Sequence, residues 1–175
     1  MITAFLIFYA VGLGFFYLQN LLFFPHVHLR LLALFLFYVG LRPSLSLALT
    51  LGLALGLLQD SYATTPFGLH LGAALVLVAA ARFFRRRLLL QRLGSQVLAS
   101  VVALALQEVY FQASAVMSGL DPFLSPEMMV HQTWEILGTA ALGPLMRHLV
   151  KGLEQFLRRL GWRAAGDRHA YRPFA

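Results

Sequence analysis

Residues 52–75 read GLALGLLQDSYATTPFGLHLGAAL, and this stretch decides the fold. An apolar segment of helical length ends at a single carboxylate, Asp60. A short turn from Ser61 to Pro66 follows, and a second apolar segment begins at Phe67 and Gly68. An ionisable group at the end of a membrane-length segment is costly to bury unless it has a partner. The stretch therefore predicts two membrane helices joined by a corner that carries a structural or functional carboxylate.

The composition of the whole chain excludes an ordinary soluble domain. Of the 175 residues, 59% are hydrophobic and only 12% are charged, which leaves little polar surface to keep a folded chain dissolved. The net charge of +7 comes from basic residues between and after the apolar runs, a pattern of membrane orientation rather than of nucleic-acid binding. The lack of cysteine excludes disulfides, thiolate catalysis and cysteine-ligated metals. The first apolar run has no basic leader and no cleavage site, so we expect a retained helix.

Apolar runs of about 17–25 residues, the length that crosses a bilayer as a helix, fill nearly all of the chain. We predict an all-α integral membrane protein with about six transmembrane helices. The second run, between Pro25 and Pro43, spans only about 26 Å as a helix. It therefore either thins the bilayer or is partly re-entrant. The six runs lie at roughly 2–24, 26–42, 44–60, 67–83, 95–118 and 128–150.

Charge asymmetry predicts the orientation of these spans. If the spans alternate, nearly all basic loop residues lie on one face, which the positive-inside rule makes cytoplasmic. Both termini are then cytoplasmic, in a bacterial inner membrane. The basic loop after the fourth run serves as a topology determinant or contacts anionic lipid or a cytoplasmic partner. Its arginines include Arg82, Arg85, Arg86 and Arg87.

The segment after the sixth run has leucine, valine and phenylalanine at helical spacing, with basic residues on its other side. It predicts either a basic amphipathic helix along the inner leaflet or a cytoplasmic extension of the last helix. We assign residues 1–163 to one transmembrane domain that includes this extension. Residues 164–175 are expected to form a disordered cytoplasmic tail.

Small residues at helical spacing indicate close helix packing. Gly52 and Gly56 form one such step, and Gly68 and Gly72 form another. A third ridge on the fifth run consists of Ser95, Ala99 and Ala103. Internal packing is one interpretation of these steps, and docking of a partner's transmembrane helix or self-association is the other.

The few polar groups inside the apolar runs are the candidates for a buried cluster. Glu108 lies in the outer part of the fifth run, Glu135 lies in the sixth, and Arg30 enters the second run from the same side. We expect Arg30 to neutralise one or more of Glu108, Glu135 and Asp60, as an ionic staple near the outer boundary. A proton or ion relay through the same acids is the alternative.

Signals of enzymatic chemistry are absent or weak. His26 and His28 share a loop without a third ligand at metal-like spacing, so we predict no metal site. The chain contains no nucleophile elbow, P-loop or dinucleotide fingerprint. We expect no catalytic residue and no cofactor.

The segment GLALGLLQDSYATTPFGLHLGAALVLVAAARFFRRR resembles the central signature of the rod-shape-determining MreD family. In that family a helix rich in Gly and Leu ends in Asp, a short loop leads to a Phe-Gly or Leu-Gly helix start, and a basic loop follows. The sixth run departs from the family pattern, because Glu135 and Gly138 stand where an Asn is expected before Pro144. The matching positions are Gly56, Leu57, Asp60, Pro66, Phe67, Gly68, Ala73 and Leu75.

The resemblance implies a non-enzymatic scaffold of the elongation machinery that inserts peptidoglycan in rod-shaped bacteria. It implies binding to MreC, and indirect links to MreB filaments, to RodA and to its partner transpeptidase. It also implies a helical arrangement similar to the substrate-binding subunits of energy-coupling-factor transporters. A small-molecule-binding subunit of such a transporter is the alternative function.

Two interpretations of Asp60 remain open at this point. The carboxylate caps the fourth helix or is solvated in the loop, without a further role. Alternatively, it holds the turn in the shape that MreC or another periplasmic partner recognises.

Overall fold

The computed structural model describes residues 2–23, 29–87, 93–119 and 126–159, and every regular element in these ranges is a helix. The described part of the chain is therefore all-α, as predicted. The α-helices are α1 (Ile2–Tyr17), α2 (Leu31–Gly40), α3 (Leu45–Tyr62), α4 (Leu69–Arg87), α5 (Leu93–Met117), α6 (Pro126–Ala141) and α7 (Gly143–Arg159), and a π-helical segment, η1 (Leu18–Phe23), continues α1.

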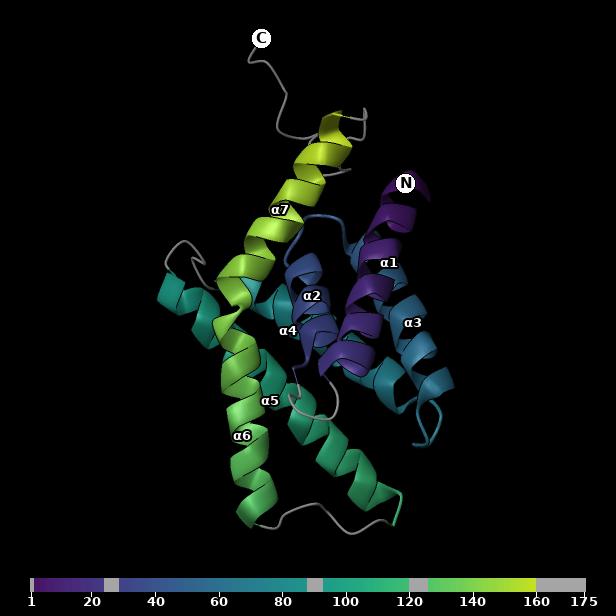
Figure 1. Cartoon of the computed structure of the whole chain (residues 1–175), viewed down its shortest axis with the longest axis vertical. Helices are drawn as coiled ribbons and strands as arrows, with labels where there is room; N and C mark the ends of the chain where they lie inside the picture. Colours follow the sequence, from purple (N-terminus) through teal and green to yellow (C-terminus); the bar gives the residue numbers. More distant parts are fainter. Residues whose placement is uncertain (1, 24–28, 88–92, 120–125, 160–175) are drawn as a thin grey trace.

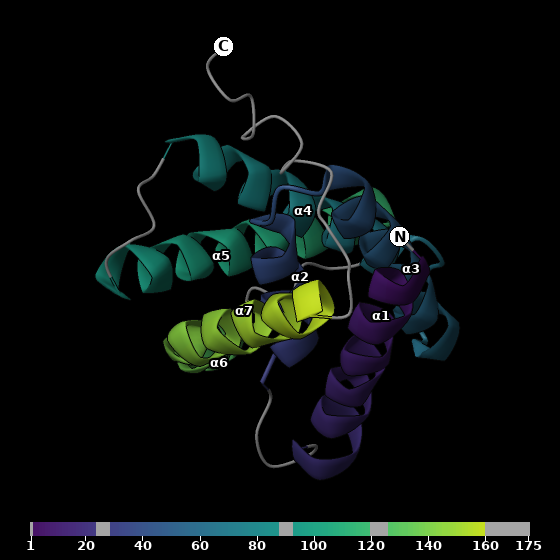
Figure 2. The ribbon, with the colours of Figure 1, turned by 90° about the horizontal axis from the view of Figure 1, so that it is seen from above.

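Helix α2 lies at the centre of the molecule. Viewed from above, the other helices surround it (Figure 2). All ten of its residues are buried, so it has no face of its own toward lipid or water. The helix occupies only part of the run between Pro25 and Pro43. At about 1.5 Å per residue it is about 15 Å long, which is half of a bilayer core.

Three described segments are long and apolar enough to cross a membrane by length and composition. They are Ile2–Asn20, Leu45–Tyr62 and Leu93–Met117. The predicted third and fifth spans agree with α3 and α5 to within about two residues at each end. The start of α1 and the end of α7 lie at the same end of the molecule, and α5 and α6 diverge toward the opposite end (Figure 1).

The sixth apolar run is two helices in the structure, where the sequence predicts one. α6 ends at Ala141 and α7 begins at Gly143. Pro144 explains the break, because proline has no N–H to donate and its ring clashes with the carbonyl four residues earlier. The Leu142 N–H bonds instead to the Thr139 carbonyl, at 3.1 Å.

Helix α7 joins the end of the sixth run to the basic extension in one continuous helix that ends at Arg159. Its apolar side is buried at Met146, Val150 and Leu157. The cytoplasmic-extension alternative fits this continuity. Trp162 and the predicted tail from residue 164 lie outside the described residues.

Candidate functional site

The corner between α3 and α4 is built on Asp60. Its carboxylate accepts hydrogen bonds from the backbone N–H groups of Gly68 at 3.0 Å, His70 at 2.8 Å and Leu71 at 3.1 Å. These N–H groups belong to the start of α4, where the first N–H groups of a helix have no partner inside the helix. The positive end of the helix dipole also favours a carboxylate there. Asp60 is therefore the N-terminal cap of α4, contributed by the end of α3.

Two glycines allow the corner to close. Gly68 has φ of +96°, a backbone conformation that residues with a side chain rarely adopt. A Cβ atom on Gly56 would lie 2.7 Å from the Leu71 Cα, so α3 and α4 cross at backbone contact. Thus Gly56, Asp60 and Gly68, three residues of the predicted signature, all serve to close the corner between α3 and α4.

The same corner exposes large aromatic side chains. Phe67 is 75% exposed and Tyr62 is 66% exposed, although both adjoin the buried Asp60 carboxylate. The Tyr62 ring also contacts Phe16 of α1, with ring centroids 5.4 Å apart. Pro66 precedes Phe67 in the exposed turn. The carboxylate is engaged inside the corner, while its neighbours face outward.

His70 contacts the same carboxylate, a contact that the sequence pattern did not predict. Its Nδ1 lies 3.1 Å from Asp60 Oδ1, and its ring packs edge-on against Phe111 of α5. The available signal was its position two residues after Gly68, where a side chain at a helix start can reach the capping residue.

Arg30, Glu108 and Glu135 come together on the same side of the molecule, from the start of α2, from α5 and from α6. Arg30 Nη1 lies 2.7 Å from Glu108 Oε2, and Nη2 lies 3.5 Å from Glu135 Oε2. The three side chains are between 14% and 21% exposed, so the ion pairs are largely shielded from solvent. Asp60 pairs with His70 rather than with Arg30. The cluster thus joins two of the three candidate acids.

Neighbouring polar groups extend this cluster. Gln112 donates to Glu108 Oε1 at 2.8 Å, and His131 Nε2 lies 3.2 Å from Glu135 Oε1. The Arg30 backbone N–H donates to Thr139 Oγ1 of α6 at 3.1 Å. The backbone and the side chain of Arg30 thus both fix the start of α2 against α5 and α6.

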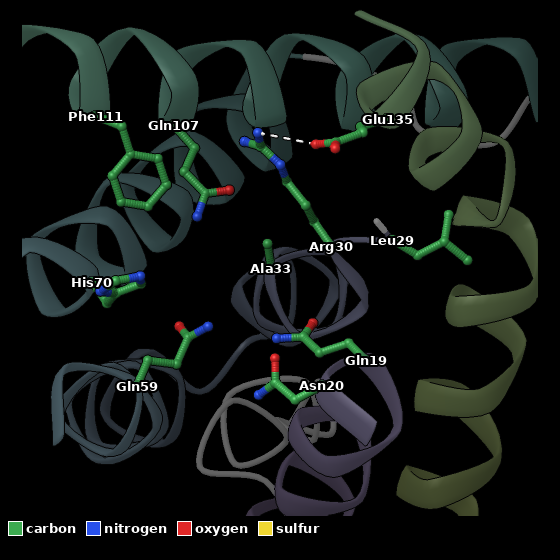
Figure 3. A pocket seen from close by; sticks show the side chains of 10 residues that line it. All are labelled: Gln19, Asn20, Leu29, Arg30, Ala33, Gln59, His70, Gln107, Phe111 and Glu135. Atoms are coloured by element: carbon green, nitrogen blue, oxygen red, sulfur yellow. Dashed lines mark ion pairs between the residues drawn. The ribbon is translucent and has the colours of Figure 1, made fainter. Parts of the chain in front are cut away.

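A polar cavity lies between Arg30 and His70. Figure 3 shows the side chains that surround it, with the Arg30–Glu135 ion pair as a dashed line. Four amides, one guanidinium, one imidazole and one carboxylate contribute polar groups. The lining residues are Gln19, Asn20, Leu29, Arg30, Ala33, Gln59, His70, Gln107, Phe111 and Glu135.

A second charged cluster, at the other end of α2, was not predicted. Arg42, which follows α2, forms an ion pair with Glu154 of α7. Arg85 donates to the Arg42 carbonyl at 2.9 Å, and Arg82 donates to the Pro43 carbonyl at 3.4 Å. Burial lowers the pKa of the Arg42 guanidinium, and Glu154 opposes this shift. Residues 112 positions apart in the chain give no local signal of such a pair.

Arg82 and Arg85 therefore bind the turn between α2 and α3, in addition to any role in topology. Arg86 and Arg87 belong to the last turn of α4. His26 and His28 lie outside the described residues. In the part of the chain that the structure describes, no group of three or more His, Asp or Glu side chains is placed to hold a metal.

The small-residue steps lie at helix contacts within the chain. Gly52 and Gly56 face α4, and a Cβ atom on Gly72 would collide with the Tyr110 hydroxyl of α5 at 1.9 Å. Ala99 and Ala103 are completely buried on α5. Internal packing thus accounts for Gly52, Gly56, Gly72, Ala99 and Ala103. Gly68 differs, because no described atom of a neighbouring segment lies within 4 Å of its Cβ position.

Comparison of the chain with curated proteins and with solved structures gives no significant match. A family model described as rod shape-determining protein MreD matches residues 1–156. The match covers the Asp60 corner, the Arg30 cluster and the Arg42–Glu154 pair, and it agrees with the all-helical, apolar fold. The chain belongs to the MreD family of rod shape-determining membrane proteins.

Proposed function

We propose that this protein is a non-enzymatic scaffold of the cell-elongation complex, which binds MreC and helps to organise peptidoglycan synthesis. The observation that carries the proposal is the Asp60 corner. It combines a rigid, internally bonded turn with two exposed aromatic side chains, Phe67 and Tyr62. Aromatic side chains are enriched in protein interfaces because they bury a large area at low entropic cost. Through MreC the scaffold would connect MreB filaments with RodA and its partner transpeptidase.

The proposed topology has six spans and cytoplasmic termini in the inner membrane. α6 and α7 together form the sixth span, and the short α2 counts as the second because its neighbours complete the crossing. In support, Arg42, Arg82 and Arg85 gather at one end of the bundle, where Glu154 pairs with Arg42. This basic end would face the cytoplasm, and the Asp60 corner would face the periplasm. The similarity to substrate-binding subunits of energy-coupling-factor transporters stays a prediction from the family resemblance.

The experiment that tests the scaffold is a pull-down of tagged protein from mild detergent, with mass spectrometry of the co-purifying chains. Phe67→Ala removes an exposed ring without touching the Asp60 hydrogen bonds. Phe83→Ala is the matched control, because Phe83 is 59% exposed at the opposite end of α4. We expect the unmodified protein and the control to retain MreC, and Phe67→Ala to lose most of it.

If Phe67→Ala and Phe83→Ala retain equal amounts of MreC, the aromatic corner is not part of the interface. Absence of a single-span coiled-coil partner from every preparation would overturn the scaffold itself. Recovery of a transmembrane coupling subunit with paired ATPases would instead favour the transporter class.

A further inference from the structure

Three neighbouring hollows share lining residues and together form a path at the end of the bundle that carries Arg30 and His70. The polar cavity described above shares Arg30, His70 and Phe111 with a second hollow between the start of α4 and α5. That second hollow shares Glu108, Gln112 and Gln132 with a groove between α5 and α6. The path therefore runs from the interior of the bundle to the gap where α5 and α6 diverge (Figure 1).

The inner end of the path holds a buried polar side chain without a partner among the described residues. Gln107 is only 7% exposed, and its Oε1 atom accepts no hydrogen bond from them. Figure 3 shows this side chain directed into the cavity, between Phe111 and Arg30. A buried acceptor without a donor is destabilising. The side chain of Gln112, farther along the path, likewise leaves its buried Oε1 without a described donor. The described lining of the path thus offers two acceptors that a ligand with N–H groups could satisfy.

The charges along the path indicate what kind of donor it would accept. Glu108 and Glu135 both lie against Arg30, and His131 also contacts Glu135. These carboxylates favour a ligand that carries its own positive charge over one whose headgroup is purely anionic. Arg30 Nη1 lies within ion-pair distance of Glu108 but is not aligned to donate a hydrogen bond to it. The Nη1 group can therefore donate to another acceptor, such as a phosphate.

The outer arm of the path is apolar. The groove between α5 and α6 has a volume of about 740 Å³, against about 240 Å³ for the polar cavity. Val109, Val116 and Met129 line it and are each more than half exposed. The inner cavity is several times larger than a water molecule, which occupies about 30 Å³, so it has room for a small headgroup. The groove has room for hydrocarbon chains.

We propose that this path binds one phospholipid with a primary ammonium headgroup. The ammonium lies near Gln107 and the two carboxylates, the phosphate lies near Arg30, and the acyl chains lie in the groove between α5 and α6. A partner's apolar helix would fill the groove but would bring no donor to Gln107. The inference does not rest on the scaffold function, because the protein alone carries all of the binding groups.

The test compares two lipids that differ in their N–H donors. The full-length protein is reconstituted in vesicles of equal parts phosphatidylethanolamine and phosphatidylcholine, released in mild detergent and analysed by native mass spectrometry. We expect one phosphatidylethanolamine per chain, retained at least about fivefold over phosphatidylcholine, whose quaternary ammonium donates no hydrogen bond. This ratio corresponds to the loss of about one net hydrogen bond.

Two pairs of variants locate the binding site. Gln107→Leu is expected to abolish the preference between the two lipids, and Gln155→Leu, on the exposed side of α7, is expected to keep it. Ala113→Trp fills the groove and is expected to reduce the retained lipid at least about fivefold, whereas Leu98→Trp, exposed outside the groove, is expected to have no effect. Thermal melting of each variant verifies that it is folded.

Equal retention of both lipids by the unmodified protein would overturn the inference. So would a preference that survives Gln107→Leu, or stronger retention of a neutral glycolipid in a parallel mixture. If Ala113→Trp releases a co-purifying single-span protein and leaves the lipid count unchanged, the groove is a helix-docking site and the inference is wrong.

Discussion

Gly56 of α3 and Leu71 of α4 lie at backbone contact, since a Cβ atom on Gly56 would stand 2.7 Å from the Leu71 Cα. Gly56→Ala must therefore push the two helices apart, and overpacking of this kind costs about 1–3 kcal/mol. The expected result is a lower melting temperature in detergent.

Gly14→Ala is the matched control for this substitution. Gly14 lies on α1, and no described atom of a neighbouring segment lies within 4 Å of the position that a Cβ atom would take there. Because alanine favours a helix by up to about 1 kcal/mol over glycine, the control should melt at the same or a higher temperature. If both variants melt alike, the close crossing of α3 and α4 is not what the glycine provides.

Asp60→Asn tests the cap of α4. The amide has one oxygen in place of two, so it cannot accept all of the hydrogen bonds from Gly68, His70 and Leu71. We expect a loss of about 1–3 kcal/mol and faster hydrogen exchange in the first turn of α4. Ser61→Ala, which removes only an exposed hydroxyl bonded to the Leu57 carbonyl, should change neither measurement much. Unaltered exchange at His70 and Leu71 in Asp60→Asn would contradict the capping role.

Arg30→Gln tests the ionic staple. It leaves Glu108 and Glu135, which are 15% and 14% exposed, without their guanidinium. Removal of one partner from a shielded ion pair costs about 3–5 kcal/mol in fully buried cases, and partial exposure here reduces the expected loss to about 2 kcal/mol. The melting temperature should therefore fall.

A rescue experiment separates charge from packing at this site. Adding Glu108→Gln and Glu135→Gln to Arg30→Gln removes the uncompensated charges, so the triple variant should recover a large part of the lost stability. A triple variant that melts no higher than Arg30→Gln would show that the charges are not what the arginine balances.

Glu154→Gln tests the pair that fixes α7 to the turn after α2. The change leaves Arg42 partly buried and without its carboxylate, so we expect faster proteolysis and hydrogen exchange in α7 and a lower melting temperature. Arg158 contacts the same carboxylate at 3.4 Å but is 52% exposed, so Arg158→Gln should cost less than about 0.5 kcal/mol. Equal effects of the two substitutions would mean that Arg42 contributes nothing specific.

The sequence predicted those parts of the fold that depend on local composition. The lengths of the apolar runs predict where α3 and α5 begin and end, because the thickness of a bilayer core sets the length of a membrane-spanning helix. The proximity of Arg30, Glu108 and Glu135 followed from their similar depth in the predicted spans. The break at Leu142 was not predicted, although Pro144 is a residue that disturbs a helix.

Other features depend on long-range packing and have no local signature. The pairing of Arg42 with Glu154 needs the relative placement of α2 and α7, which charge counting does not give. Capping of α4 by Asp60 was one interpretation of the sequence, but only the placement of α4 against the end of α3 shows which N–H groups the carboxylate binds. Gln107 looks in the sequence like any other amide in an apolar helix, and only the surrounding cavity distinguishes it.

The burial of α2 has a consequence for how the family can vary. A helix at a lipid boundary tolerates almost any apolar residue on its outer side, so its variation has a period near 3.6 residues. Every residue of α2 instead contacts protein, and even Gly40 has no room for a Cβ atom beside Ala81. A complete scan of substitutions should therefore find α2 uniformly intolerant around its circumference, a ten-residue segment that can change only when its neighbours change with it.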